Sequence, residues 1–62
     1  MNLTKYEANL IAQLLEDRAA QCNRNVMAYN EIASAALVAH YWNEQKDIAS
    51  DLAIKYREVG KA

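Results

Sequence analysis

The chain has 62 residues, of which 53% are hydrophobic and 24% charged, and its net charge is −1. This balance predicts one folded domain over residues 1–62 and excludes a disordered segment. Cys22 is the only cysteine, so disulfides within the chain cannot stabilise it. The chain also lacks the excess of basic residues that non-specific binding to nucleic acid requires. A domain of this size buries only about 60% of its unfolded surface, so we expect it to need a second copy.

The first predicted element is a helix that begins after Thr4. Thr4 followed by Glu7 is the pattern of a capping box, in which the threonine hydroxyl and the glutamate carboxylate each accept from the other residue's backbone amide. Apolar side chains then recur with the 3.6-residue period of a helix. They are Tyr6, Leu10, Ile11, Leu14 and Leu15. We therefore predict a helix with an apolar face from residue 5 onward.

The end of this helix has two candidate positions, because the chain has no proline and a single glycine near its end. Asn23 and Asn25 lie close together, and asparagine readily closes a local turn or caps a following helix. We predict the turn at residues 22–25. The alternative is a helix that continues to Asn30 and breaks at residues 28–30.

A second helix is predicted from Val26, and it is apolar on nearly all sides between residues 32 and 38. One neighbouring helix cannot cover every side of such a segment, so we expect a homodimer. Tyrosine and tryptophan bury a large area while keeping a polar group, and both are frequent at interface hot spots. The predicted interface residues are Tyr29, Ile32, Ala36, Leu37, Tyr41 and Trp42.

A polar stretch at residues 43–47 predicts a kink, the start of a third helix, or the exposed part of one long helix. Gly60 stands where a left-handed cap would end the last helix. A heptad repeat fits Val38, Tyr41, Ile48, Leu52 and Val59. Extended backwards, it places Asp17 or Gln13 in the seam, which disfavours a single long coiled coil. The predicted fold is therefore all-α: a helical hairpin of two long helices, the second either continuous, kinked or split into a third, that we expect to dimerise into a helical bundle.

No group of side chains predicts catalysis. His40 is the only histidine, and with Glu44 and Asp47 it offers too few ligands for a metal site. The sequence has no glycine-rich phosphate loop and no nucleophile beside an activating base. A chain this short would also struggle to enclose a pocket of about 300 Å³. We expect no catalytic residues, no metal and no cofactor.

The C-terminal segment, residues 45–62, supports an alternative hypothesis. Its apolar and small residues resemble the spacing of a repressor-type helix-turn-helix, in which Ala49 would let two helices cross closely. Ala53 stands where the turn usually has glycine, and the chain ends soon after the second helix would begin. In this alternative the protein is a DNA-binding regulator. The predicted contacts to DNA are Lys55, Tyr56, Arg57 and Lys61.

The sequence favours a cytoplasmic location. No basic region precedes an apolar segment at the start, as it does in a signal peptide. The most apolar stretch, residues 26–42, contains several polar residues and is shorter than the roughly 20 residues that a membrane span requires. A lone cysteine fits a reducing compartment.

The opening Met1-Asn2-Leu3-Thr4-Lys5-Tyr6-Glu7 and the short, alanine-rich chain carry a family resemblance. The chain resembles the small helical accessory proteins that lambdoid phages encode between the exonuclease and excisionase genes. The resemblance implies a non-enzymatic factor that influences phage development in the host cytoplasm, and it carries over no site residues. The leading hypothesis is a helical interaction protein that forms a homodimer and binds an unidentified host or phage protein.

Overall fold

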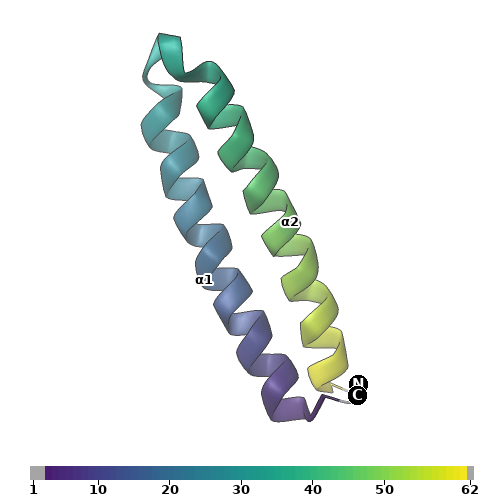
Figure 1. Ribbon diagram of the computed structural model, residues 1–62. Helices are drawn as coiled ribbons and strands as arrows, with labels where there is room; N and C mark the ends of the chain where they lie inside the picture. The colour runs from purple at the N-terminus through teal and green to yellow at the C-terminus, as the bar shows by residue number, and fades with distance from the viewer. Residues whose placement is uncertain (1–2, 62) are drawn as a thin grey trace.

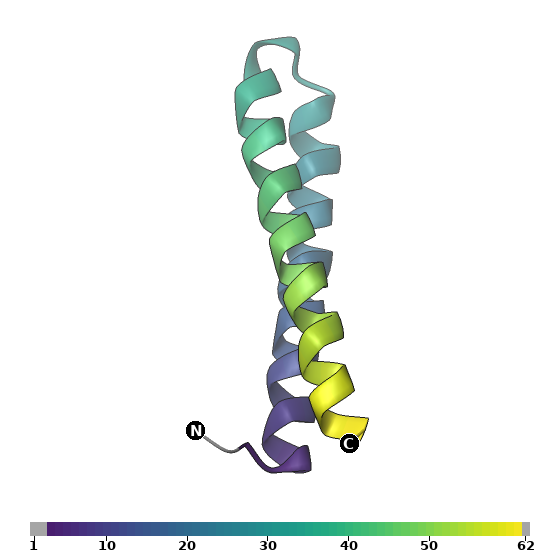
Figure 2. The same ribbon diagram turned by 90° about the vertical axis from the view of Figure 1, so that its right-hand side faces the viewer.

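The computed structural model describes residues 3–61, which form an antiparallel hairpin of two helices (Figure 1). Helix α1 spans Lys5–Asn30, the short 3₁₀ turn η1 spans Ala33–Ala35, and helix α2 spans Ala36–Lys61. The helices lie side by side along their length, and the first turn of α1 lies at the same end as the last turn of α2 (Figures 1 and 2). The predicted all-α hairpin is confirmed, and its second helix is neither split nor interrupted.

The start of α1 is fixed by the predicted capping box, which is confirmed. The Glu7 amide donates to Thr4 Oγ1 at 3.1 Å, and the Thr4 amide donates to Glu7 Oε1 at 3.0 Å. These hydrogen bonds satisfy two backbone donors that the first turn of a helix cannot pair by itself. Hydrogen bonds from the Thr4 amide and then from the Thr4 side chain hold the pKa of the Glu7 carboxyl below its usual value, because they favour its charged form.

Helix α1 continues past residues 22–25, so the turn predicted there is wrong and the alternative end near Asn30 is correct. The side chains around the asparagines pair along the helix and do not close a turn. Gln21 Nε2, for example, donates to Asn25 Oδ1 at 3.4 Å, one helical turn away. Cys22 is fully buried on the side that faces α2, which favours the helical conformation at this point.

The chain reverses around Ile32, whose backbone is extended with φ −109° and ψ 108°. The Ile32 amide donates to the Tyr29 carbonyl at 3.0 Å, and the Ala35 amide donates to the Ile32 carbonyl at 3.0 Å. The second helix therefore begins at Ala36 and not near Val26, as the early turn had implied. As a consequence, the apolar residues 32–35 form the tip of the hairpin and not the middle of a helix.

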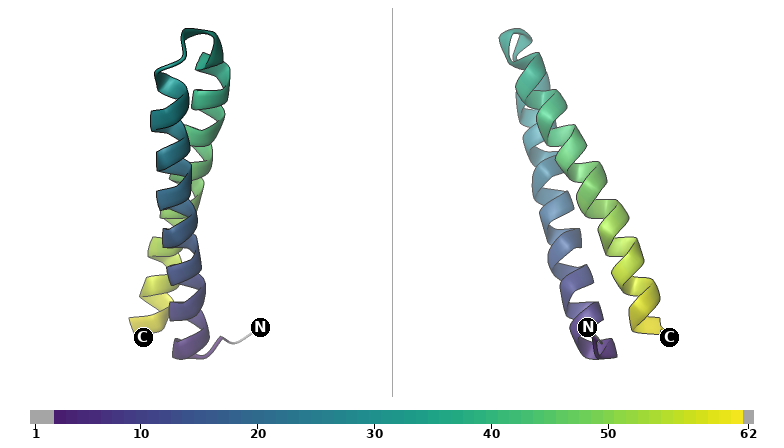
Figure 3. Two further views of the ribbon diagram at one scale, coloured as in Figure 1. Left: turned by 90° about the vertical axis from the view of Figure 1, so that its left-hand side faces the viewer. Right: turned by 45° about the vertical axis from the view of Figure 1, so that its right-hand side comes forward.

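The two helices meet along a line of mostly small residues, which we call the alanine seam. Its positions alternate by three and four residues, as in a left-handed coiled coil. On α1 they are Ala8, Ala12, Leu15, Ala19, Cys22 and Val26, and on α2 they are Ala39, Trp42, Lys46, Ala49, Ala53, Tyr56 and Gly60. Its fully buried members are five alanines and one cysteine, so no large side chain separates the helices there. Figure 3 shows the resulting close, slightly inclined pair.

Gly60 belongs to this seam, and the left-handed cap predicted for it is wrong. Helix α2 continues to Lys61, and no described glycine has a positive φ. A methyl group at Gly60 would collide with the side-chain amide of Asn9 on α1. Because Asn9 is a flexible side chain that could shift, the contact places Gly60 at the close approach of the two helices without requiring glycine there.

Candidate functional site

Residues 3–61 form no pocket, and they contain no cluster of three or more His, Cys, Asp or Glu side chains suited to a metal ion. The single histidine lies on the exposed surface of α2, where His40 Nε2 is 2.9 Å from Glu44 Oε1. Neither described helix has an apolar stretch long enough to cross a membrane.

Most large apolar side chains lie outside the alanine seam. On α2 they precede the seam positions by one residue, and because each residue advances by about 100° around the axis, they share one flank of the helix. These residues are Val38, Tyr41, Ile48, Leu52 and Val59, and each is more than a third exposed. The heptad repeat predicted from the sequence is thus turned away from α1.

Helix α1 adds to the same flank of the hairpin. Ile11 and Leu14 precede the seam positions Ala12 and Leu15, and the side chain of Leu14 is 61% exposed. The two helices run in opposite directions and also face in opposite directions, toward each other. The two reversals offset each other, so the residues that precede the seam positions lie on the same side of the hairpin in both helices. We call this surface the outer face. It consists of Ile11, Leu14, Val38, Tyr41, Ile48, Leu52 and Val59.

The predicted interface residues separate into two groups. Four of them are exposed at or beside the tip of the hairpin: Tyr29, Ile32, Ala36 and Leu37. Leu37, in the first turn of α2, is 86% exposed and is the most exposed of the large apolar residues. We call Tyr29, Ile32 and Leu37 the tip cluster.

The other two predicted interface residues lie further along α2. Tyr41 belongs to the outer face, whereas Trp42 is half-buried in the seam. Their rings meet edge to face, with centroids 5.2 Å apart and planes at 78°. The guanidinium carbon of Arg18 on α1 lies 5.3 Å from the Trp42 ring centroid, a cation–π distance. Trp42 thus contributes to the contact between the two helices.

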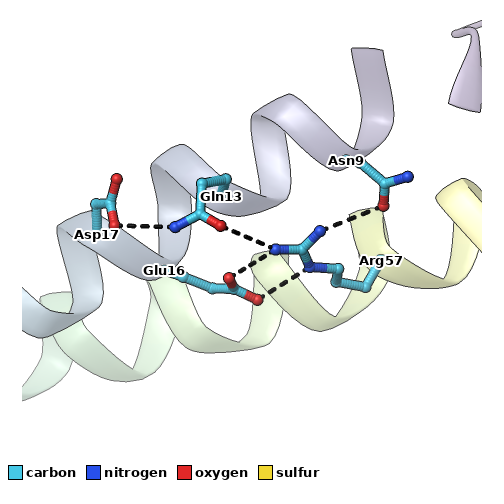
Figure 4. Close-up of polar contacts among 5 residues, drawn as sticks. All are labelled: Asn9, Gln13, Glu16, Asp17 and Arg57. Atoms are coloured by element: carbon cyan, nitrogen blue, oxygen red, sulfur yellow. Dashed lines mark hydrogen bonds and ion pairs between the residues drawn. The ribbon is translucent and has the colours of Figure 1, made fainter. Parts of the chain in front are cut away.

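The opposite flank of the hairpin is polar and is centred on Arg57 (Figure 4). Arg57 Nε and Nη2 donate to the two carboxylate oxygens of Glu16 at 3.1 and 2.8 Å. The same guanidinium donates to Asn9 Oδ1 at 3.4 Å and to Gln13 Oε1 at 3.3 Å. Gln13 in turn donates to Asp17 Oδ1 at 3.1 Å. This network fixes the register of the two helices on one side only.

The Arg57 network makes the hairpin sensitive to acid. Hydrogen bonds from Arg57 hold the pKa of Glu16 below its usual value of 4.5. A carboxyl whose pKa is lowered by folding stabilises the fold above the unfolded pKa, and this contribution is lost as pH falls through the folded value. The stability of the hairpin should therefore decline below about pH 4.5, with Glu7 contributing in the same direction.

We expect Glu16→Gln to make this decline shallower, because the substituted side chain cannot ionise. The measurement is the urea midpoint, followed by circular dichroism between neutral pH and the acid range. Glu58→Gln, an exposed position on α2, is the matched control and should keep the full acid dependence. Equal slopes for the wild type and Glu16→Gln would contradict this assignment.

The helix-turn-helix alternative for residues 45–62 lacks its turn. Residues 45–61 are one uninterrupted part of α2, and Ala62 lies outside the described residues. Alanine at position 53 is a good helix former and packs into the seam, so nothing breaks the helix there. Among the proposed DNA contacts, Arg57 is engaged by Glu16 and Tyr56 is half-buried in the seam. Lys55 and Lys61 are exposed.

Sequence reasoning did not place Leu14, Ile48, Leu52 and Val59 on a binding surface. Their apolar character and spacing were visible, but they are what a reader would assign to the core of the hairpin. The signal that distinguishes them is the residue that follows each one. Leu15, Ala49, Ala53 and Gly60 form a second repeat of mostly small residues, displaced by one position.

Comparison of the chain with protein-family models, with curated proteins and with solved structures finds no significant match.

Proposed function

We propose that the protein is a non-enzymatic helical interaction protein, which acts in the cytoplasm by binding another protein of the host or of a phage. The observation that carries this proposal is the distribution of apolar side chains. The buried positions among residues 3–61 hold only alanine and cysteine, whereas most of the exposed large apolar residues lie on the tip cluster and the outer face. Large contiguous apolar surfaces on small soluble proteins are typical of interaction sites.

The tip cluster is the surface proposed to bind the host or phage protein. It lies at the reversal of the chain, where Leu37 is 86% exposed and Ile32 and Tyr29 are partly exposed. Tyrosine and large aliphatic side chains of this kind act as anchors that enter pockets on a partner. The sequence predicted these residues as the interface between two copies of the chain. Their exposure at the tip supports a role in binding, which we assign to the host or phage protein.

The proposed biological setting is that of a phage-encoded accessory or regulatory factor that influences phage development. Its support is the resemblance of the opening residues and of the alanine-rich composition to the small lambdoid phage proteins. Met1 and Asn2 of that opening lie outside the described residues. A role by binding fits the absence of a pocket among residues 3–61.

We expect Leu37→Asp to weaken capture of the partner by about 30-fold or more, the effect of removing an interface hot spot. Leu37 is almost fully exposed in the first turn of α2, where an acidic side chain is favourable, so the hairpin itself should stay folded. The measurement is quantitative mass spectrometry of proteins captured from a bacterial host lysate by the immobilised chain.

Ile54→Asp is the matched control for this experiment. Ile54 is also a large aliphatic residue of α2 and is 62% exposed, but it lies beside Arg57 on the polar flank. We expect the wild type and Ile54→Asp to capture the same one or few proteins. Leu37→Asp should not capture them. The same captured proteins with all three chains would contradict it.

A further inference from the structure

We propose that a second copy of this chain covers the outer face, so that two hairpins form a four-helix bundle. The inference rests on the proposed function, because it names a partner for part of the apolar surface on which that function depends. It concerns the outer face and leaves the tip cluster free for a different protein.

The first argument is the repeat along α2. The positions 38, 41, 45, 48, 52, 55 and 59 alternate by three and four residues, and five of the seven are large and apolar. This is the seam of a coiled coil, which requires a facing helix of the same period and similar length. Helix α1 already occupies the neighbouring alanine seam. A second copy of α2 supplies a helix with the required period and length.

The second argument is surface area. The chain exposes 4626 Å² and measures 45 × 15 × 14 Å. A compact protein of 7.0 kDa would expose about 4,000 Å². The excess of roughly 600 Å² is close to the 600–1,000 Å² that each partner buries in a standard protein interface. Covering the outer face would thus lower the exposed surface of each chain to the value expected for a compact protein of its mass.

The third argument is charge. Among the positions that lie one residue before a seam position, only Glu7, Arg18 and Lys55 are charged. Arginine and lysine have long, flexible side chains whose charged ends can reach the edge of an interface. Depletion of charge is typical of the core of an interface. Because the net charge of each chain is only −1, electrostatic repulsion between two copies is weak.

Ile48 is the decisive residue of this proposal. It lies at the centre of the repeat, so in a symmetric dimer it meets its own copy whether the two α2 helices run parallel or antiparallel. It is 53% exposed, so an aspartate there is hydrated in the monomer. In the dimer the same substitution would bring two carboxylates together in an apolar seam.

The test is sedimentation equilibrium of the wild type, Ile48→Asp and Ile54→Asp between 1 and 100 µM. We expect twice the 7.0 kDa chain mass for the wild type and for Ile54→Asp. Dimerisation of Ile48→Asp should be about 100-fold weaker or more. A monomeric wild type at 100 µM would overturn the proposal, and so would equal dimerisation of all three chains.

If Ile48→Asp does not fold, a second variant tests dimerisation through the outer face. Gln45→Leu replaces a polar member of the same repeat by an apolar one, and it should tighten the dimer by about tenfold, the value of one well-buried aliphatic group. An unchanged dissociation constant would overturn the proposal. A monomeric wild type that still captures its partner through Leu37 would refute only the proposal that a second copy covers the outer face. A dimeric wild type that captures no partner through Leu37 would refute only the proposed function.

Discussion

Replacing Ala53 by leucine is expected to lower the free energy of unfolding by about 2–3 kcal/mol. Ala53 is 3% exposed and packs where α2 lies against α1 in the alanine seam. Leucine and alanine have nearly the same helix propensity, so the expected loss is steric and not conformational. The larger side chain must push the helices apart, and it thereby disturbs the neighbouring contacts of Ala49 and of Arg57.

Urea unfolding followed by circular dichroism, at one fixed protein concentration, measures this effect. Ala20→Leu is the control, because Ala20 is exposed on α1 and the same substitution there should change stability by no more than about 0.5 kcal/mol. If the helices were instead loosely packed, leucine at position 53 would fill space and raise the stability. A stabilised Ala53→Leu protein would therefore contradict the close packing of the seam.

The sequence was sufficient to predict the local features that depend on neighbouring residues. The capping box of Thr4 and Glu7 and the helical character of the chain follow from short-range patterns, and the fold-back into a hairpin follows from a heptad repeat that does not extend through the whole chain. The position of the reversal did not follow. Asn23 and Asn25 favour a turn in isolation, but a buried Cys22 and side-chain pairs along the helix favour continuation.

The sequence did not predict which side of each helix packs against the other helix. Apolar patterns are dominated by large residues, which on α1 select Tyr6, Leu10 and Leu14, and these are all exposed. The contact between the helices uses alanines at the same spacing but a different rotation, so their small side chains give a weak signal. Gly60 shows the same difficulty, since a glycine at a close approach of two helices looks in sequence like one that ends a helix.

The two faces of the hairpin have different consequences for stability. The polar flank is bonded internally through Arg57, whereas the outer face groups six of the exposed large apolar side chains, each of which the single hairpin leaves more than a third exposed. A core of five alanines and one cysteine buries little apolar area, so the proposed association is expected to supply stability that a larger core would provide. We therefore expect folding and self-association of this chain to be coupled.

Thermal unfolding at different protein concentrations tests this coupling most directly. When folding and dimerisation are coupled, the midpoint rises with concentration, and for two chains of 62 residues a 100-fold increase should raise it by about 10 °C. We predict this rise for the wild type, followed by circular dichroism between 1 and 100 µM. A wild-type midpoint that stays the same across this range would contradict the account.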